Sequence, residues 1–252
     1  MKPTLTLVGA GPGDPELITL KGIKALQQAD VVLYDALVST ELLTYAPAHA
    51  QLVYVGKRRG RCEFAQSDLN QLIVDYALTY GHVVRLKGGD SFVFGRGYEE
   101  IAFAQEFGIQ TAVIPGISSS ISVPALAGIP LTCRGVSESF WVLTGTTKNH
   151  SLSNDVAKAA HSTATLVILM GMQHLSQITA LLSEAGRGHT PVAIIQNGST
   201  PQQKLGLGTV DTIVEVVEKE QLANPAIIVI GEVVRLHPAY PNGRLEATMA
   251  FG

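Results

Sequence analysis

Hydrophobic residues in the first half of the chain form short apolar runs that alternate with segments of helical spacing. The runs predict strands at 5–8, 31–33, 52–55, 83–86 and 111–114. Helices are predicted between them at 19–28, 67–80 and 99–107. The second helix has the most regular pattern, with Ser67 as its N-cap, Gly81 as its end, and apolar residues at i, i+3, i+4, i+7, i+8 and i+11 from Leu69.

The second half of the chain repeats this alternation. Strands are predicted at 140–144, 166–170, 192–196, 205–207 and 226–230, and helices at 174–185 and 210–222. Strands that alternate with helices indicate an α/β protein with largely parallel sheets in both halves. We expect two α/β domains at 1–116 and 136–236, a tightly packed connection at 117–135, and a loosely ordered tail at 237–252.

Glycine and polar residues are concentrated directly after the predicted strand at 83–86. Gly88 and Gly89 leave the backbone without side chains where this strand ends. Residues with potential chemistry follow, namely Asp90, Phe92, Phe94, Arg96, Glu99 and Glu100. Ligands of α/β proteins bind at the carboxyl ends of strands, so the whole stretch favours a binding site over a glycine-rich turn, which one Gly-Gly pair alone would indicate.

Three other predicted strands end in distinctive loops. Residues 9–14 read Gly-Ala-Gly-Pro-Gly-Asp, and Asp14 stands where a dinucleotide loop needs its third glycine. A pyrophosphate is therefore disfavoured, whereas the aspartate suits a cationic or hydroxyl-bearing ligand. Asp35 lies at the end of the second strand. It is either an acid that binds ribose or a strand-end acid without a catalytic role. The cations at 57–61 form either a solvated face or a clamp for carboxylates.

Composition and charge narrow the class of function. The net charge of −3, from 18 basic and 21 acidic residues, provides no overall basic field for nucleic acid. No apolar run is long enough to cross a bilayer, and the apolar stretch after Met1 is too short for a secretory signal. Cys62 and Cys133 lack paired spacing, which fits a reducing cytoplasm and argues against a zinc site. We expect a cytoplasmic protein without metal, nucleic-acid or membrane partners.

A series of motifs, in order along the chain, resembles the uroporphyrinogen-III C-methyltransferases, a family of tetrapyrrole methylases. The matching segments are Val-Gly-Ala-Gly-Pro-Gly-Asp at 8–14, Ile-Thr-Leu-Lys-Gly at 18–22, Tyr-Asp at 34–35, Val-Gly-Lys-Arg at 55–58, Arg-Leu-Lys-Gly-Gly-Asp at 85–90, Phe-Gly-Arg-Gly at 94–97, Pro-Gly-Ile at 115–117, Gly-Ile-Pro-Leu-Thr at 128–132, Met-Gly at 170–171 and Asn-Gly at 197–198. The resemblance runs from Leu7 to about Val234.

The resemblance implies a homodimeric enzyme of two α/β domains, with S-adenosylmethionine bound in an inter-domain cleft. The family methylates uroporphyrinogen III at C2 and C7, through precorrin-1 to precorrin-2, for sirohaem and cobalamin, and releases S-adenosylhomocysteine. The implied cofactor-binding residues are Pro12, Gly88, Gly89, Asp90, Val93, Ser118, Ser119, Met170 and Gly198. The implied catalytic residues are Asp35 as proton acceptor, Lys57 as proton donor, and Arg96 and Glu99, which with Met170 match positions linked to the tetrapyrrole. Because the chain starts at the methylase motif, we expect it to be monofunctional.

The chain departs from the family pattern at Ser91, Tyr98, Cys133 and the pair Ser118-Ser119. Tyr98 adds a ring beside Arg96 that reshapes the expected substrate cleft. A methylase for a later precorrin, a nicotinamide-dependent oxidoreductase and a cofactor-binding module without turnover stay open as alternatives, although Asp14 disfavours the oxidoreductase. Residue chemistry fits a polycarboxylate substrate, since six cations at 57, 58, 59, 61, 96 and 134 fall in loops or at strand ends. An arginine is a poor base, so Arg96 is expected to anchor the substrate.

Overall fold

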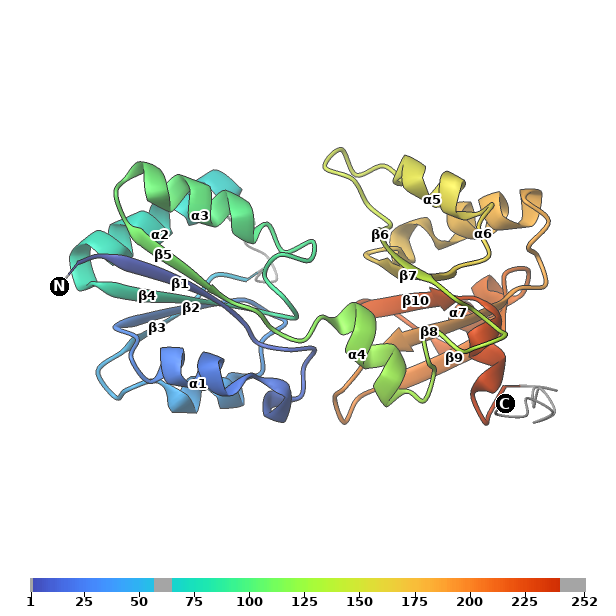
Figure 1. Ribbon diagram of the computed structural model, residues 1–252, viewed down its shortest axis with the longest axis horizontal. Coiled ribbons are helices and arrows are strands. Elements are labelled where there is room, and N and C mark those ends of the chain that lie inside the picture. The colour runs from blue at the N-terminus through green and yellow to red at the C-terminus, as the bar shows by residue number, and fades with distance from the viewer. Residues whose placement is uncertain (1, 57–64, 241–252) are drawn as a thin grey trace. The chain divides into compact units, whose positions relative to one another are not determined.

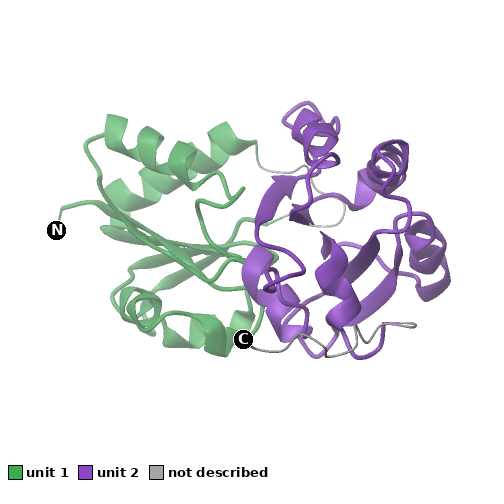
Figure 2. Ribbon diagram, turned by 45° about the vertical axis from the view of Figure 1, so that its right-hand side comes forward, with its two compact units in different colours: residues 1–118 green, residues 119–252 purple. Residues whose placement is uncertain are grey.

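The computed structural model describes residues 2–56 and 65–240. The chain divides into two compact units, Met1–Ser118 and Ser119–Gly252, which Figure 2 colours green and purple. Each unit contains one five-stranded sheet with helices on both faces. The α/β class predicted from the alternation of strands and helices is confirmed, and the chain is described below one unit at a time.

The sheet of the first unit is parallel throughout. Its strands are β1 (Thr4–Gly9), β2 (Val31–Tyr34), β3 (Gln51–Tyr54), β4 (His82–Lys87) and β5 (Gln110–Ile114), in the order β3-β2-β4-β1-β5. All five strands coincide with predicted ones. The two central strands are β1 and β4, which pair along their whole length, with Leu5 opposite Val83 and Gly9 opposite Lys87.

Helices cover both faces of this sheet because side chains alternate along each strand. Val8, Val32 and Val84 face one way and pack with α1 (Leu20–Leu26) and the 3-10 helix η2 (Thr40–Tyr45). Their neighbours in sequence face α2 (Gln66–Tyr80) and α3 (Gly97–Glu106). Figure 1 shows these two helix layers on opposite sides of the sheet; a short 3-10 helix, η1 (Pro15–Leu17), precedes α1.

Helix α2 begins two residues earlier than an N-cap at Ser67 predicts. Its N-cap position is Ala65, so Ser67 lies inside the first turn, where its hydroxyl donates to Asp68 over 3.3 Å. The prediction of Ser67 as N-cap is therefore wrong, since a serine signals a helix start only when its own backbone is still extended. Gly81 ends the helix with a φ of 109°, as expected for glycine.

The sheet of the second unit is mixed. Its strands are β6 (Phe140–Thr144), β7 (Thr165–Leu169), β8 (Pro191–Gln196), β9 (Lys204–Thr209) and β10 (Ala226–Ile230), in the order β6-β7-β10-β8-β9. Only β6 and β7 pair in parallel, whereas β10 runs antiparallel to both β7 and β8, and β9 runs antiparallel to β8. The expectation of a largely parallel sheet is wrong for this half, because residues 197–203 are too few for the crossover that parallel neighbours need.

Helices also cover both faces of the second sheet. One face packs against α5 (Asn154–Ala159), α6 (Leu175–Glu184) and α7 (Ile213–Glu220). The other face packs against α4 (Ser119–Leu126) and the 3-10 helix η4 (Glu232–Leu236), while η3 (Met172–His174) leads into α6. Helix α5 is absent from the sequence prediction because it is too short to show a helical period.

Among the helices that the structure describes, none has the length and apolar character needed to span a membrane.

Candidate active site at the carboxyl edges of the sheets

The central strands β1 and β4 lie side by side, but the chain leaves them in opposite directions. After β1 it continues to α1 on one face of the sheet, and after β4 it continues to α3 on the other. Such a switch point at the carboxyl ends of neighbouring strands is where ligands bind in α/β proteins. The parallel sheet thus brings the predicted residues of the first unit to one edge, since Pro12, Asp35, Asp90 and Ser118 each follow a different strand.

Three glycines allow the loops at this edge to pack backbone against backbone. A Cβ on Gly9 would lie 2.7 Å from the Gly89 carbonyl oxygen, and a Cβ on Gly116 would lie 2.6 Å from the Gly9 carbonyl carbon. Gly11 and Gly89 also exchange two backbone hydrogen bonds of 3.2 and 2.7 Å. Gly9 at the end of β1 and Gly116 after β5 are therefore required for contacts between loops, apart from any ligand.

The Asp90 carboxylate ties two of these loops together. Its Oδ1 accepts a hydrogen bond from the Phe92 backbone N–H at 2.8 Å, and its Oδ2 accepts one from the Gly116 N–H at 3.0 Å. Val93 closes the same turn by donating its N–H to the Asp90 carbonyl oxygen at 3.3 Å. A carboxylate offers about four lone-pair positions. The half-buried Asp90 therefore orders the loop and keeps acceptor capacity for a ligand.

Asp35 lies at the end of β2, next to the glycine loop. Its Oδ1 accepts from the Leu37 N–H at 3.1 Å, and its Oδ2 lies 3.4 Å from a terminal nitrogen of Arg85. The side chain is 24% exposed. A Cβ on Gly88 would lie 2.6 Å from the Leu37 Cβ, so Gly88 allows the loop that carries Asp35 to pack against the loop after β4.

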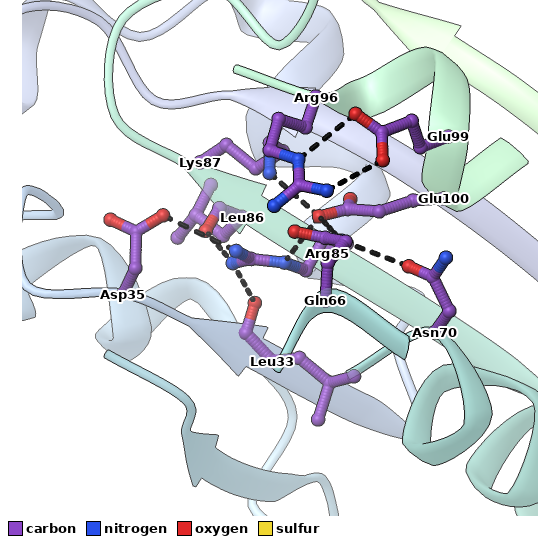
Figure 3. A network of polar contacts seen from close by, with 10 residues as sticks. All are labelled: Leu33, Asp35, Gln66, Asn70, Arg85, Leu86, Lys87, Arg96, Glu99 and Glu100. Atoms are coloured by element: carbon purple, nitrogen blue, oxygen red, sulfur yellow. Dashed lines mark hydrogen bonds and ion pairs between the residues drawn. The ribbon is translucent and has the colours of Figure 1, made fainter. Parts of the chain in front are cut away.

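A buried cluster of charges, formed by Arg85, Lys87 and Glu100, lies beneath this edge (Figure 3). The Lys87 ammonium donates to Glu100 Oε1 at 2.7 Å, and Arg85 Nε lies 3.5 Å from the same oxygen. Gln66 reaches Glu100 at 3.4 Å and Asn70 at 2.9 Å. The side chain of Glu100 is fully buried, and that of Arg85 is 4% exposed.

Burial changes the chemistry of Lys87. Desolvation lowers the pKa of Lys87 from 10.5, the positive charge of Arg85 lowers it further, and Glu100 opposes both effects. The strand pattern alone did not single out Arg85, Lys87 or the partner role of Glu100. A signal was present, because Arg85 and Lys87 share a side of β4 with the buried Val83, and two buried cations require an acid nearby.

Arg96 and Glu99 form an exposed pair at the start of α3. The Arg96 guanidinium donates to both Glu99 oxygens at 2.9 and 2.7 Å, and about half of each side chain is exposed (52% and 50%). Exposed ion pairs contribute about 0–1 kcal/mol to stability, so exchanging Glu99 for a carboxylate of a ligand would cost little. Tyr98 lies in the same turn, and its ring is exposed.

The predicted residues of the second unit also follow strands that run in one direction. Met170 follows β7 and Gly198 lies just beyond β8, and both strands are antiparallel to β10. The Thr146 hydroxyl donates to the Met170 carbonyl oxygen at 2.7 Å. A Cβ on Gly198 would lie 2.7 Å from Val123 Cγ2, so Gly198 provides the space for α4, the helix that begins at Ser119.

Residues other than glycine with positive φ gather in these loops. The described residues include seven of them, and five follow β4, β7 or β8: Phe94, Arg96, Met170, Asn197 and Ser199. Such backbone strain tends to cluster at functional sites. The observation supports a functional role for the loop after β4 in the first unit and, separately, for the loops after β7 and β8 in the second unit. Lys57 and the neighbouring cations at 58, 59 and 61 lie outside the described residues, as does Cys62.

The groups at these strand ends fit the chemistry of S-adenosylmethionine. This cofactor carries a sulfonium, an ammonium, ribose hydroxyls and a carboxylate. In the first unit, the Asp90 carboxylate provides an acceptor for the cationic and hydroxyl parts. The Met170 carbonyl oxygen accepts a hydrogen bond from the Thr146 hydroxyl, and the Gly198 backbone packs against α4. The backbone at Asp90, Met170 and Gly198 is thus ordered by contacts within its own unit.

The fold and these loops define a class of protein, and comparison with known proteins identifies it. Residues 4–214 match the family described as Tetrapyrrole (Corrin/Porphyrin) Methylases. The chain belongs to this family of methylases. It is 50% identical over 232 residues to the uroporphyrinogen-III C-methyltransferase of Methanocaldococcus jannaschii, a match that covers 91% of this chain and 96% of the relative.

Solved structures agree with this assignment. The uroporphyrin-III C-methyltransferase of Thermus thermophilus, solved with S-adenosylhomocysteine, superposes with a TM-score of 0.80 at 37% identity, covering 92% of this chain and 99% of the other. A cobalt precorrin-4 methyltransferase reaches a TM-score of 0.81 at 26% identity, covering 92% and 95% of the two chains. The two structures share the fold equally well, but the sequence is more similar to the uroporphyrin-III enzyme.

Proposed function

We propose that this protein transfers methyl groups from S-adenosylmethionine to C2 and C7 of uroporphyrinogen III, through precorrin-1 to precorrin-2. The observation that carries the proposal is the 50% identity to a uroporphyrinogen-III C-methyltransferase over nearly the full length of both chains. The lower identity to the precorrin-4 enzyme, at 26%, makes a later precorrin the second choice of substrate. Membership of a methylase family removes the basis for the oxidoreductase alternative.

The chemistry requires few protein groups beyond positioning. Bound S-adenosylmethionine supplies a methyl group already activated by its sulfonium, so no nucleophilic side chain is needed. A ring carbon of the reduced macrocycle is electron-rich, and after its methylation the neighbouring meso carbon must release a proton. We assign acceptance of that proton to the Asp35 carboxylate, which is partly exposed at the strand edge. A placed base contributes about 10²–10⁴-fold to such a step.

The binding roles rest on the family resemblance, and the position of these residues in loops and at the start of a helix supports them. We assign cofactor binding to Pro12, Gly88, Gly89, Asp90, Val93 and Ser118 in the first unit, and to Ser119, Met170 and Gly198 in the second. Arg96 would anchor a substrate carboxylate by exchanging its exposed partner Glu99, because an arginine binds carboxylates through two parallel hydrogen bonds. Lys57 as proton donor rests on the family resemblance alone.

We further propose that the protein is a cytoplasmic homodimer. The absence of paired cysteine spacing supports a reducing compartment. Sedimentation at several protein concentrations would test the dimer, because a single species at the monomer mass of 26.7 kDa would contradict it. We also propose that precorrin-2, the product of the reaction, enters sirohaem or cobalamin synthesis.

Mass analysis of the reaction product tests the central proposal. The protein is incubated without oxygen with uroporphyrinogen III and methyl-labelled S-adenosylmethionine, and we expect two labelled methyl groups on the macrocycle. Calorimetry with S-adenosylhomocysteine and with NAD serves as the control for cofactor class. Binding of S-adenosylhomocysteine without methyl transfer would indicate a binding module, and heat with NAD alone would contradict a methylase.

A further inference from the structure

The guanidinium of Arg85 lies between two carboxylates that come from different elements (Figure 3). One terminal nitrogen lies 3.4 Å from Asp35 Oδ2 at the end of β2, and Nε lies 3.5 Å from Glu100 Oε1 in α3. The other terminal nitrogen donates to the backbone carbonyl oxygens of Leu33 at 3.3 Å and Leu86 at 3.0 Å. Arg85 thus connects the buried charge cluster to the strand edge.

These contacts fix the plane of the guanidinium. An arginine side chain has rotamer freedom, and it becomes a rigid support only where several of its donors are engaged. Here one terminal nitrogen donates to carbonyl oxygens of the neighbouring strands β2 and β4, and Nε forms an ion pair, without a hydrogen bond, with the fully buried Glu100. The nitrogen that remains is directed at Asp35, the partly exposed end of the network.

We propose that Arg85 is a positioning residue that holds the Asp35 carboxylate in place for proton acceptance in the methyl-transfer reaction. The inference rests on the proposed function. The proton leaves the meso carbon next to the methylated ring, its bonding electrons neutralise the positive charge of that ring, and an O–H bond forms on Asp35. Arg85 transfers no proton itself. Without Arg85, the side-chain hydrogen bond that the carboxylate keeps among the described residues is the one from the Leu37 N–H.

Lys87 offers a matched control for a purely structural role of Arg85. Both residues are cations on the same side of β4, both are almost fully buried, and both pair with Glu100. The ammonium of Lys87 donates a hydrogen bond to Glu100 at 2.7 Å. Of these two cations, only Arg85 forms a hydrogen bond with Asp35 among the described residues. Both changes remove a buried positive charge that interacts with Asp35, but only the Arg85 change removes a hydrogen bond to Asp35.

A double-mutant cycle separates these roles. The variants are Asp35→Asn, Arg85→Gln, the double variant and Lys87→Gln, with kcat and KM measured for uroporphyrinogen III. We expect Asp35→Asn to lower kcat by about 10²–10⁴-fold. Arg85→Gln should lower kcat by about 10²-fold with little change in KM, as misplaced catalytic groups do. In the Asp35→Asn background, Arg85→Gln should change kcat by less than about twofold, because coupled residues are not additive.

Thermal melts show whether each variant is folded. Calorimetry shows whether each variant binds S-adenosylhomocysteine. Arg85→Lys keeps the positive charge and should recover part of the lost kcat; it replaces Arg85→Gln in the cycle if the latter does not fold. If the Arg85 change lowered kcat by the same factor in the wild type and in Asp35→Asn, the inference would be overturned. So would a Lys87→Gln variant with the same loss of kcat and the same coupling to Asp35. A wild-type protein that does not methylate uroporphyrinogen III would instead remove the proposed function.

Discussion

Replacing Glu100 with glutamine tests whether the buried cluster depends on a negative charge. Glutamine keeps the size of the side chain and one acceptor oxygen, so the change removes little except charge. Glu100 Oε1 lies 2.7 Å from Lys87 and 3.5 Å from Arg85. At an effective dielectric constant of about 20, these distances correspond to attractions of about 6 and about 5 kcal/mol.

The net cost of Glu100→Gln is smaller than these attractions, because removing the carboxylate also removes its desolvation penalty of several kcal/mol. Leaving buried charges without their partner typically costs about 3–5 kcal/mol. We expect a loss of that size in the free energy of unfolding. The loss should shrink as the pH rises, because the pKa of Lys87 is already lowered by burial and an uncharged Lys87 no longer needs the carboxylate.

Urea unfolding followed by far-UV circular dichroism measures this loss, and Glu99→Gln is the matched control. Glu99 lies beside Glu100 in α3 and forms two hydrogen bonds with Arg96, but its side chain is half exposed. The control should lose only about 0–1 kcal/mol. If Glu100→Gln and Glu99→Gln lost the same small amount, the buried carboxylate would not hold the cluster together and the reasoning would be refuted.

Three further predictions concern Lys87 and the loops. Because the pKa of Lys87 is below 10.5 in the folded protein, the unfolded chain binds more protons between that lowered pKa and pH 10.5, so stability rises with pH there. We expect urea unfolding across that range to show a smaller rise in the stability of Lys87→Met than in that of the wild type. Parallel curves of stability against pH for the two proteins would contradict this prediction. Gly116→Ala brings a Cβ against the backbone of Gly9 and should weaken S-adenosylhomocysteine binding at least tenfold by calorimetry, whereas Gly108→Ala, with open space around its Cβ, should leave affinity unchanged. Asp90→Asn replaces one oxygen that accepts a hydrogen bond from a backbone N–H by an amide group that donates. We expect this change also to reduce the affinity for S-adenosylhomocysteine. Equal affinities of the variant and the wild type would show that the loop does not need Asp90.

The sequence by itself predicted the strands, most helices and the α/β class. These features depend on local patterns, because a run of apolar residues with glycine at its end has few ways to be buried. The same local pattern located the loop at Gly88, Gly89 and Asp90 directly after β4, as the structure has it. The motif series implied a methylase of uroporphyrinogen III, and the comparisons agree with it.

Only the tertiary structure decided how these elements pair. The placement of β10 between β7 and β8 makes the second sheet mixed, and no local pattern in residues 226–230 encodes the direction of its neighbours. The contact of Glu100 with Arg85 and Lys87 likewise joins a helix to a strand. Local periodicity shows which side of an element is buried, but what it is buried against depends on long-range packing. For that reason, the support of Asp35 by Arg85 became visible only in the folded chain.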